Sequence, residues 1–405
     1  MRAMAYWLSL LLIFTMPWDT AIETSDFGSL SRMLGLLVAA CWIGTVVVTR
    51  EIRRPHLFHM VFFLFVCWHL LSVLWTVDST KTLGRLGTYV ELFVLMYIVW
   101  DLFLTPNSIK GGLQAYVWGA WITVAGMAYN FLSDVRFTSI RYSAFGFDEN
   151  NVGVILALGI PIAWYLGTVR SPNRLVNALN KTNVLYVPAA LFAILLTGSR
   201  GSVLAALPGI AYVLASSGRL RFSTRVVVWV LLGAIGVILL PYVPDALLDR
   251  VSTTGSEISE GDLNGRVGIW IAGFNAFAQH PFLGVGSSAF TSSTSLEKAA
   301  HNSYLVVLFE LGVIGFSLLL LLMIVTAYYV FVHPKESRYF WIALLSVLAL
   351  GIFSLNWAHR KQNWIFPILA ITSAYVQVNQ VRTQRTSRSR VDTARANSKS
   401  SAQKV

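Results

Sequence analysis

Three side chains of this sequence have the types and surroundings of a chemical site, and each lies in a short polar turn between apolar segments. Arg200 lies within a Gly-Ser-Arg-Gly-Ser turn over residues 198–202, Arg266 follows an Asn-Gly pair, and His301 opens the polar run 301–304. The glycines beside Arg200 let the backbone approach a ligand closely. Arg266 begins a predicted helix, whose exposed N–H groups and positive dipole end add to its charge and suit a phosphate.

Displacement at a phosphorylated carbon is the chemistry that such residues suit. A diphosphate leaving group needs its developing negative charge stabilised, either by a divalent metal ion or by fixed guanidinium groups. The acceptor hydroxyl has to lose a proton, and a His side chain is best suited to accept it near neutral pH. Two Arg and one His on one face therefore supply both functions without a metal.

Less specific interpretations apply to each residue taken alone. An Arg at a helix end ordinarily extends to the lipid headgroups, and a single His at an interface is more often a structural polar residue than a catalyst. A weaker candidate site is the polar turn over residues 148–151, with Arg136 and Arg141 before it. What favours a site at Arg200, Arg266 and His301 is that all three are predicted at one face of the protein.

Acidic side chains allow two further interpretations. Glu257, Glu260 and Asp262 have the spacing of ligands for a divalent ion bound to a diphosphate, but their Ser-, Thr- and Gly-rich surroundings favour a solvated turn. Glu91 and Glu310 lie within apolar segments, where a carboxylate is costly unless it is paired or faces water. For Glu310, a structural ion pair and a role in orienting an inner cavity are both open.

The composition sets the class of protein that must position these residues. Hydrophobic residues make up 56% of the 405 positions and charged residues only 12%, whereas a soluble domain has roughly 25% charged residues. This excludes an ordinary soluble enzyme, and two cysteines exclude a disulfide-stabilised secreted chain of this size. The net charge of +12 is attributed to loops that set orientation and not to nucleic-acid binding. We predict an all-α polytopic membrane protein.

Near-continuous apolar windows predict about twelve transmembrane helices, since each needs about 20 residues. Their expected ranges are 4–17, 30–49, 56–76, 84–104, 111–132, 150–168, 183–197, 202–217, 226–241, 303–332, 339–355 and 364–380. A cytoplasmic N-terminus puts most Lys and Arg residues of the loops inside, as the positive-inside rule requires. The first segment is expected to remain as a helix, because no small-x-small cleavage site precedes Trp18.

The predicted organisation has four parts. Transmembrane helices occupy residues 1–241, an outer loop occupies 242–302, transmembrane helices resume over 303–381, and a basic tail follows over 382–405. The tail is rich in Ser, Thr and Arg and is expected to be a disordered cytoplasmic segment.

The loop over residues 242–302 is far longer than the others, and long loops without regular structure are usually functional. We predict an amphipathic helix within it, on the membrane surface or over the mouth of the bundle. Asn264 is expected to cap this helix and Pro281 to stop it. Its apolar stripe consists of Val267, Trp270, Ile271, Phe274 and Phe277, with Gly268, Gly273, Asn275 and Gln279 off the stripe.

Several short motifs occur in a fixed order over the second half of the chain. They are Gly-Ser-Arg-Gly at 198–201, Gly-Arg at 265–266 followed by Trp270, His-Pro-Phe-Leu-Gly-Val-Gly at 280–286, His-Asn-Ser-Tyr-Leu at 301–305 and Glu-Leu-Gly-Val-Ile-Gly at 310–315. In order and spacing they resemble the O-antigen ligase family, within the O-antigen ligase and polymerase superfamily. The resemblance covers roughly residues 140–325, and elsewhere only hydropathy and span number agree.

The resemblance implies a glycosyltransferase with a GT-C-like fold in the bacterial inner membrane, with its site and a helical loop domain facing the periplasm. Its donor would be O-antigen linked to undecaprenyl diphosphate, and its acceptor a sugar hydroxyl of lipid A-core in lipopolysaccharide synthesis. Membrane lipids, but no nucleic acid, would be its other partners. In an inverting displacement without metal or cofactor, Arg200 and Arg266 would hold the diphosphate and His301 would activate the acceptor. Candidate substrate contacts are Arg136, Arg141, Asn302 and Tyr304.

Other functions remain open at this point. A polymerase of O-antigen or exopolysaccharide repeats shares the plan, and a protein glycosyltransferase is disfavoured because such members carry an extra outer domain after the last spans. A flippase or transporter of lipid-linked glycans would instead show repeats and a charged site near the bilayer midplane. The distinctive charges gather at one interface, which favours the enzyme.

Overall fold

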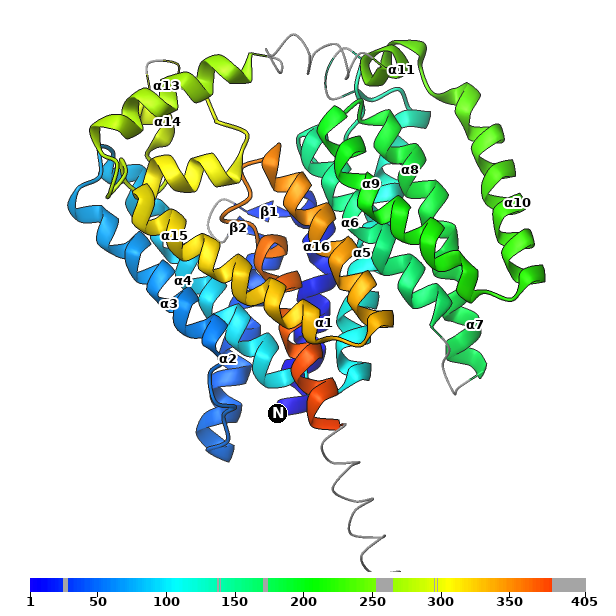
Figure 1. Ribbon diagram of the computed structural model, residues 1–405, viewed down its shortest axis with the longest axis horizontal. Helices are drawn as coiled ribbons and strands as arrows, with labels where there is room; N and C mark the ends of the chain where they lie inside the picture. Colours follow the sequence, from blue (N-terminus) through cyan, green and yellow to red (C-terminus); the bar gives the residue numbers. More distant parts are fainter. Residues whose placement is uncertain are drawn as a thin grey trace, which may run out of the picture.

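The computed structural model describes residues 1–24, 28–136, 138, 140–169, 174–252, 265–294, 296 and 298–380. Within these ranges the chain is almost entirely helical, and every predicted apolar segment falls on a helix (Figure 1). The basic tail, Asn264 and the acidic residues Glu257, Glu260 and Asp262 lie outside the described residues.

The helices that coincide with predicted spans reproduce several boundaries closely. They are α1 (Arg2–Thr15), α2 (Leu30–Thr49), α3 (Leu57–Leu71), α4 (Ser79–Leu102), α5 (Pro106–Leu132), α6 (Glu149–Thr168), α8 (Tyr186–Leu196), α9 (Arg200–Ser216), α10 (Phe222–Leu239), α15 (Ser303–Val332), α16 (Lys335–Phe353) and a helix over residues 361–380. Shorter helices are α7 (Arg174–Thr182), α11 (Asp245–Ser252), α13 (Arg266–Gln279) and α14 (Phe290–Ser293). The strands β1 (Glu23–Thr24) and β2 (Gly28–Ser29) form one small antiparallel pair that the sequence did not indicate.

Six of these helices are each long and apolar enough to cross a membrane, among the residues searched: α2, α3 with the turn after it, α4, α6, α15 and α16. The apolar helices that include α8, α9 and α10 are shorter. The prediction of an all-α polytopic membrane protein is confirmed. The GT-C likeness stays a prediction.

Helix α6 forms the centre of one half of the bundle. Residues 152–164 of α6 are all buried, and the helix packs against α5, α8, α9 and α16. In the other half, α3 packs against α4 and α15, and α1 against α2 and α5. Figure 1 shows the N-terminus at one end of this bundle, here called the proximal end, and α11 and α13 at the opposite end, here called the distal end.

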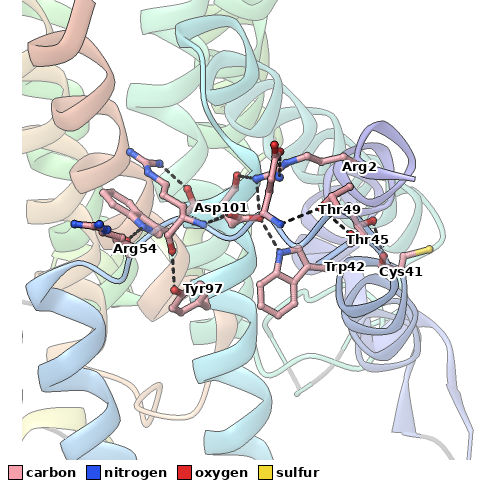
Figure 2. Close-up of polar contacts among 11 residues, drawn as sticks. Arg2, Cys41, Trp42, Thr45, Thr49, Arg54, Tyr97 and Asp101 are labelled. Carbon is pink, nitrogen blue, oxygen red and sulfur yellow. Dashed lines mark hydrogen bonds and ion pairs between the residues drawn. The ribbon is translucent and has the colours of Figure 1, made fainter. Parts of the chain in front are cut away.

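A buried carboxylate fastens the helices at the proximal end. Asp101, near the end of α4, accepts hydrogen bonds from the Arg2 guanidinium at 2.9 Å, from Trp42 Nε1 at 2.9 Å and from the backbone N–H of Arg53 at 2.8 Å (Figure 2). A carboxylate with several donors and a charged partner is satisfied despite its burial. This cluster joins α1, α2 and α4 and holds the chain just before α3.

Helix α15 is interrupted at Gly312, whose backbone has φ 66° and ψ −170°. The break exposes the carbonyl groups of Phe309 and Glu310, which accept hydrogen bonds from the N–H groups of Val285 and Gly286 at 3.0 and 2.9 Å. The motif over residues 280–286 thus inserts its backbone into the break. Its Gly-rich sequence allows this close approach and has a structural role.

Candidate functional site

Four helices begin near one another at the distal end. The residues that cap or precede their first turns are Asp148 for α6, Ser199 for α9, Gly265 for α13 and Asn302 for α15. Helix starts carry unpaired N–H groups and the positive end of the dipole. Bringing several starts together favours an anion at this place.

Hydrogen bonds join three of these starts. The Ser199 hydroxyl donates to Asn150 Oδ1 at 2.8 Å, which ties α9 to α6. Trp357, in the connection after α16, donates its ring N–H to Asn151 Oδ1 and its backbone N–H to the Ser303 hydroxyl at 2.7 Å. The connection after α16 therefore bridges the starts of α6 and α15.

His301 lies directly before α15 in a left-handed backbone conformation, with φ 47°. An L-residue adopts this conformation at a cost, so it persists only where neighbouring contacts hold it. Asn302 provides them, because its side chain accepts from the N–H groups of Tyr304 and Leu305 at 3.0 and 3.1 Å. The backbone N–H of Asn302 also donates to Asn356 Oδ1 at 3.2 Å. The imidazole is half-buried.

Charges from two other helix starts act on His301. Burial lowers the pKa of the imidazole below its ordinary value, the positive charge of Arg266 lowers it further, and the negative charge of Asp148 opposes both. Burial likewise lowers the pKa of Arg266, while Asp148 raises it and Arg141 lowers it. His301, Arg266 and Asp148 therefore lie within electrostatic reach of one another, and His301 is neutral near pH 7.

Arg141 is held from several sides next to this cluster. Its Nε donates to the carbonyl of Thr197 at 2.8 Å, its Nη2 donates to Asn150 Oδ1 at 3.0 Å, and Nε lies 3.4 Å from a carboxylate oxygen of the buried Glu149. These bonds fix the polar turn before α6 against the end of α8. Arg141 contributes positive charge to the site from a fixed position.

Arg200 is the first residue of α9. Its neighbour Ser199 caps the helix by accepting from the N–H of Ser202 at 3.3 Å and also binds Asn150. A Cβ atom added at Gly201 would lie 2.6 Å from the hydroxyl of Ser354, so this glycine permits close packing on the connection after α16. The backbone of Arg200 is thus joined to the same network as Arg141.

The remaining candidate residues have structural contacts. Arg136 pairs with Asp134 at 2.8 Å. Asn302 is buried and its side chain caps α15, as described above. The Tyr304 hydroxyl donates to the carbonyl of Ala349 at 3.1 Å and so links α15 to α16. Their contact with a substrate stays a prediction.

The predicted surface helix exists as α13, but its buried face differs in part from the expected one. Ile269 and Gly273 are its buried residues, whereas Ile271 and Phe274 are 57% and 47% exposed. The reason is the small size of Gly273, where an added Cβ would meet the ring of Phe309. Helix α13 therefore packs against the first half of α15 through Gly273, and part of the apolar stripe of α13 faces outward.

Glu310 has structural contacts, although backbone N–H groups, and not the ion pair considered from the sequence, satisfy its carboxylate. Its carboxylate accepts from the N–H groups of Ser288 and Phe290 at 2.8 and 3.4 Å and so anchors the segment after α13. Within the described part of the chain, no group of three His, Cys, Asp or Glu residues is placed to hold a metal ion.

The connection between α16 and the last helix was missed in the sequence analysis. Asn356 and Trp357 position the residues around His301, yet neither belongs to a motif. The only available signal was an unusual polar run, Asn-Trp-Ala-His-Arg-Lys-Gln-Asn over residues 356–363, between two apolar spans.

The fold and this cluster define a polytopic membrane protein with a cationic site at one end of its bundle. Residues 185–320 match a family model described as O-antigen ligase, and this range contains Arg200, Arg266 and His301. No curated protein matches the chain. The resemblance expected from the motifs is confirmed over these residues, which are similar to the O-antigen ligase domain.

Proposed function

We propose that this protein is an O-antigen ligase, which transfers a glycan from undecaprenyl diphosphate to a sugar hydroxyl of lipid A-core at the periplasmic face of the inner membrane. The observation that carries the proposal is the grouping of His301, Arg266 and Asp148 at the distal end, within a domain of the ligase family. A half-buried neutral imidazole beside a guanidinium group suits an acceptor hydroxyl and an anionic leaving group.

In the proposed reaction His301 is the general base. The acceptor oxygen attacks the anomeric carbon of the donor sugar, and its proton passes to the imidazole. The bond between the anomeric carbon and the diphosphate oxygen breaks on the opposite side, so the configuration inverts. The lowered pKa of His301 keeps it unprotonated before the reaction.

Arg266 and Arg200 are proposed to hold the diphosphate. Undecaprenyl diphosphate leaves with more negative charge than it had in the donor, and fixed guanidinium groups stabilise that charge. The starts of α9 and α13 are proposed to add N–H groups to the same anion site. Arg141, fixed by its bonds to Thr197 and Asn150, adds positive charge without having to move.

The proposal is tested with the purified full chain, donor and acceptor in detergent. His301→Ala is expected to abolish transfer and to retain donor binding, because the base is lost and the diphosphate contacts are kept. Arg266→Lys is expected to lose at least tenfold in kcat/KM, because an ammonium group cannot reproduce a two-pronged guanidinium contact. Arg221→Gln, an exposed residue before α10, is the matched control and should retain full activity.

A polymerase is the second candidate, because the matched domain serves ligase and polymerase activities alike. The same assay separates the two when donor is supplied without lipid A-core. Products that lengthen by whole repeats on undecaprenyl diphosphate would establish a polymerase and overturn the ligase. Transfer that requires lipid A-core would support the ligase.

A further inference from the structure

A cavity of about 450 Å³ lies apart from His301, between α2, α4 and the connection that precedes the last helix. Its wall combines two kinds of side chain. The charged ones are Arg32, Arg85, Arg360 and Lys361 with Asp19 and Glu91, and the apolar ones include Leu36, Ala39, Leu92, Leu95 and Ile98. Four cationic groups therefore face two carboxylates.

The carboxylates compensate these cations unequally. Arg32 forms a close ion pair with Glu91 at 2.8 Å. Arg360 and Lys361 share the single carboxylate of Asp19 at 3.8 and 3.9 Å, distances longer than a hydrogen bond. The positive charge of this region thus exceeds the negative charge that the cavity wall supplies.

Arg85 has no direct ion-pair partner in the described ranges, although the buried carboxylate of Glu310 lies within its electrostatic reach. Arg85 is half-buried in α4 and has no hydrogen bond with any residue in those ranges. Burial lowers the pKa of the neighbouring His359 well below its ordinary value, and the charges of Arg85, Arg360 and Lys361 lower it further. A guanidinium group taken partly out of water without a partner is costly, so an anion in the cavity would stabilise it.

The apolar part of the wall indicates what else the occupant carries. Leu36 and Ala39 on α2 face the same cavity as Leu92, Leu95 and Ile98 on α4, and these residues lie along both helices on the proximal side of Arg32 and Arg85. Leu36 is 51% exposed, so this part opens toward the surroundings of the bundle. The cavity fits a molecule with an anionic head and a hydrocarbon chain.

We propose that this cavity binds a phosphate-bearing membrane lipid, with its phosphate between Arg85, Arg360 and Lys361 and its chain between α2 and α4. This site is separate from the proposed diphosphate site but adjacent to it. The guanidinium carbon of Arg360 lies 5.7 Å from the ring centroid of Phe147, the residue before Asp148. The phosphate of this lipid and the diphosphate of the donor then lie on two sides of the turn that contains Phe147 and Asp148.

The test measures lipid binding to the purified, delipidated full chain by native mass spectrometry. The probes are dioleoyl phosphatidic acid, dioleoylglycerol, which has the same chains without phosphate, and inorganic phosphate. Phosphatidic acid should bind, and Arg85→Gln should weaken its binding at least tenfold. Arg221→Gln, which removes an exposed guanidinium group outside the cavity, should leave binding unchanged.

A second variant tests the cavity without removing a charge. Gly35 lines the cavity, and a Cβ atom added there meets no atom within 4 Å, so Gly35→Leu projects into the chain path without disturbing the helix. It should block phosphatidic acid, whereas Gly87→Leu, at an equally open glycine of α4 outside the cavity wall, should not. If Arg85→Gln does not fold, the comparison of Gly35→Leu with Gly87→Leu tests the lipid site without it.

Three results would overturn the proposal. Equal binding of dioleoylglycerol would remove the role of the phosphate, and displacement of the lipid by inorganic phosphate at equal concentration would show a site for the free ion. Unchanged binding in both Arg85→Gln and Gly35→Leu would place the lipid elsewhere. Phosphatidic acid should still bind to His301→Ala, so that failure of the transfer reaction and failure of this site are told apart.

Discussion

The backbone N–H of Asn302 donates a 3.2 Å hydrogen bond to Oδ1 of Asn356, a residue 54 positions later in the chain. Asn302 follows the left-handed His301 and caps α15. The bond therefore fixes the backbone on one side of the proposed base to the connection after α16. Through Trp357 and Asn151 that connection also reaches the start of α6, so one loop sets the position of His301 relative to Asp148.

Asn356→Ala should misplace the imidazole without removing it. The buried N–H of Asn302 loses its acceptor, and an unsatisfied buried donor costs roughly 1 to 3 kcal/mol of stability. We expect kcat to fall at least tenfold with little change in the KM for donor, measured by steady-state transfer kinetics. Asn356→Asp keeps an acceptor and should recover most of the loss. A fall in Tm with unchanged kcat in Asn356→Ala would show that the bond serves stability alone.

Replacing His301 by Ala and by Gly separates the catalytic role of the imidazole from the cost of the left-handed backbone conformation. His301→Ala retains a side chain in the left-handed region, whereas His301→Gly adopts φ 47° freely. Both variants should be inactive because both lack the base. His301→Gly should be the more stable of the two by about 1 kcal/mol, visible as a higher Tm in thermal unfolding. Transfer activity in either variant would exclude His301 as the base.

The pH dependence of transfer should report the charge of Asp148. The neutral imidazole is the active form, so the rate falls on the acid side as pH drops through the lowered pKa of His301, below about 6.5. The Asp148 carboxylate raises that pKa, and Asp148→Asn removes the charge. The acid limb of the profile should therefore move to lower pH. The rate at neutral pH, where the imidazole is already unprotonated, should not change.

Asn is as good a helix cap as Asp, so this substitution preserves the start of α6, where Asp148 accepts from the N–H of Asn150 at 2.9 Å. Asp134→Asn is the matched control, since Asp134 pairs with Arg136 and has no part in the shift at His301. An acid limb that moves to higher pH in Asp148→Asn would contradict the arrangement.

Hydropathy located the helices well because each span has to satisfy its backbone internally and present apolar side chains. The ranges 30–49 and 303–332 were predicted with the same ends as α2 and α15. Hydropathy could not locate the break in α15, because Gly312 is one glycine among 29. The conformation of Gly312 depends on hydrogen bonds between α15 and the backbone of residues 281–286, a separate segment that precedes α15 in the chain.

The candidate residues could be selected from the sequence because a charged or titratable side chain falls in a short polar turn between apolar segments, as at Arg266 and His301. The grouping of these two residues with Asp148 needed the structure, because it depends on which helix starts are neighbours. Neither the role of Asn356 nor the cavity around Arg85 corresponds to a motif in the sequence. Both features depend on which distant segments of the chain the fold brings together.

The break in α15 provides the strongest prediction about stability. Gly312 has φ 66° and ψ −170°, a backbone region that is essentially restricted to glycine. A Cβ atom at this position would also collide with the carbonyl group of Phe282. Gly312→Ala should therefore cost at least about 3 kcal/mol and detach residues 281–286 from α15. Tm in thermal unfolding of the purified protein measures the loss.

Gly233→Ala is the control for the substitution at Gly312. It lies in α10 with no atom within 4 Å of the added Cβ, and it should gain up to about 1 kcal/mol. If Gly312→Ala cannot be purified, its yield from the membrane relative to Gly233→Ala gives the same comparison. Equal Tm and equal yield for the two variants would mean that α15 closes its break without harm and that the glycine is not required there.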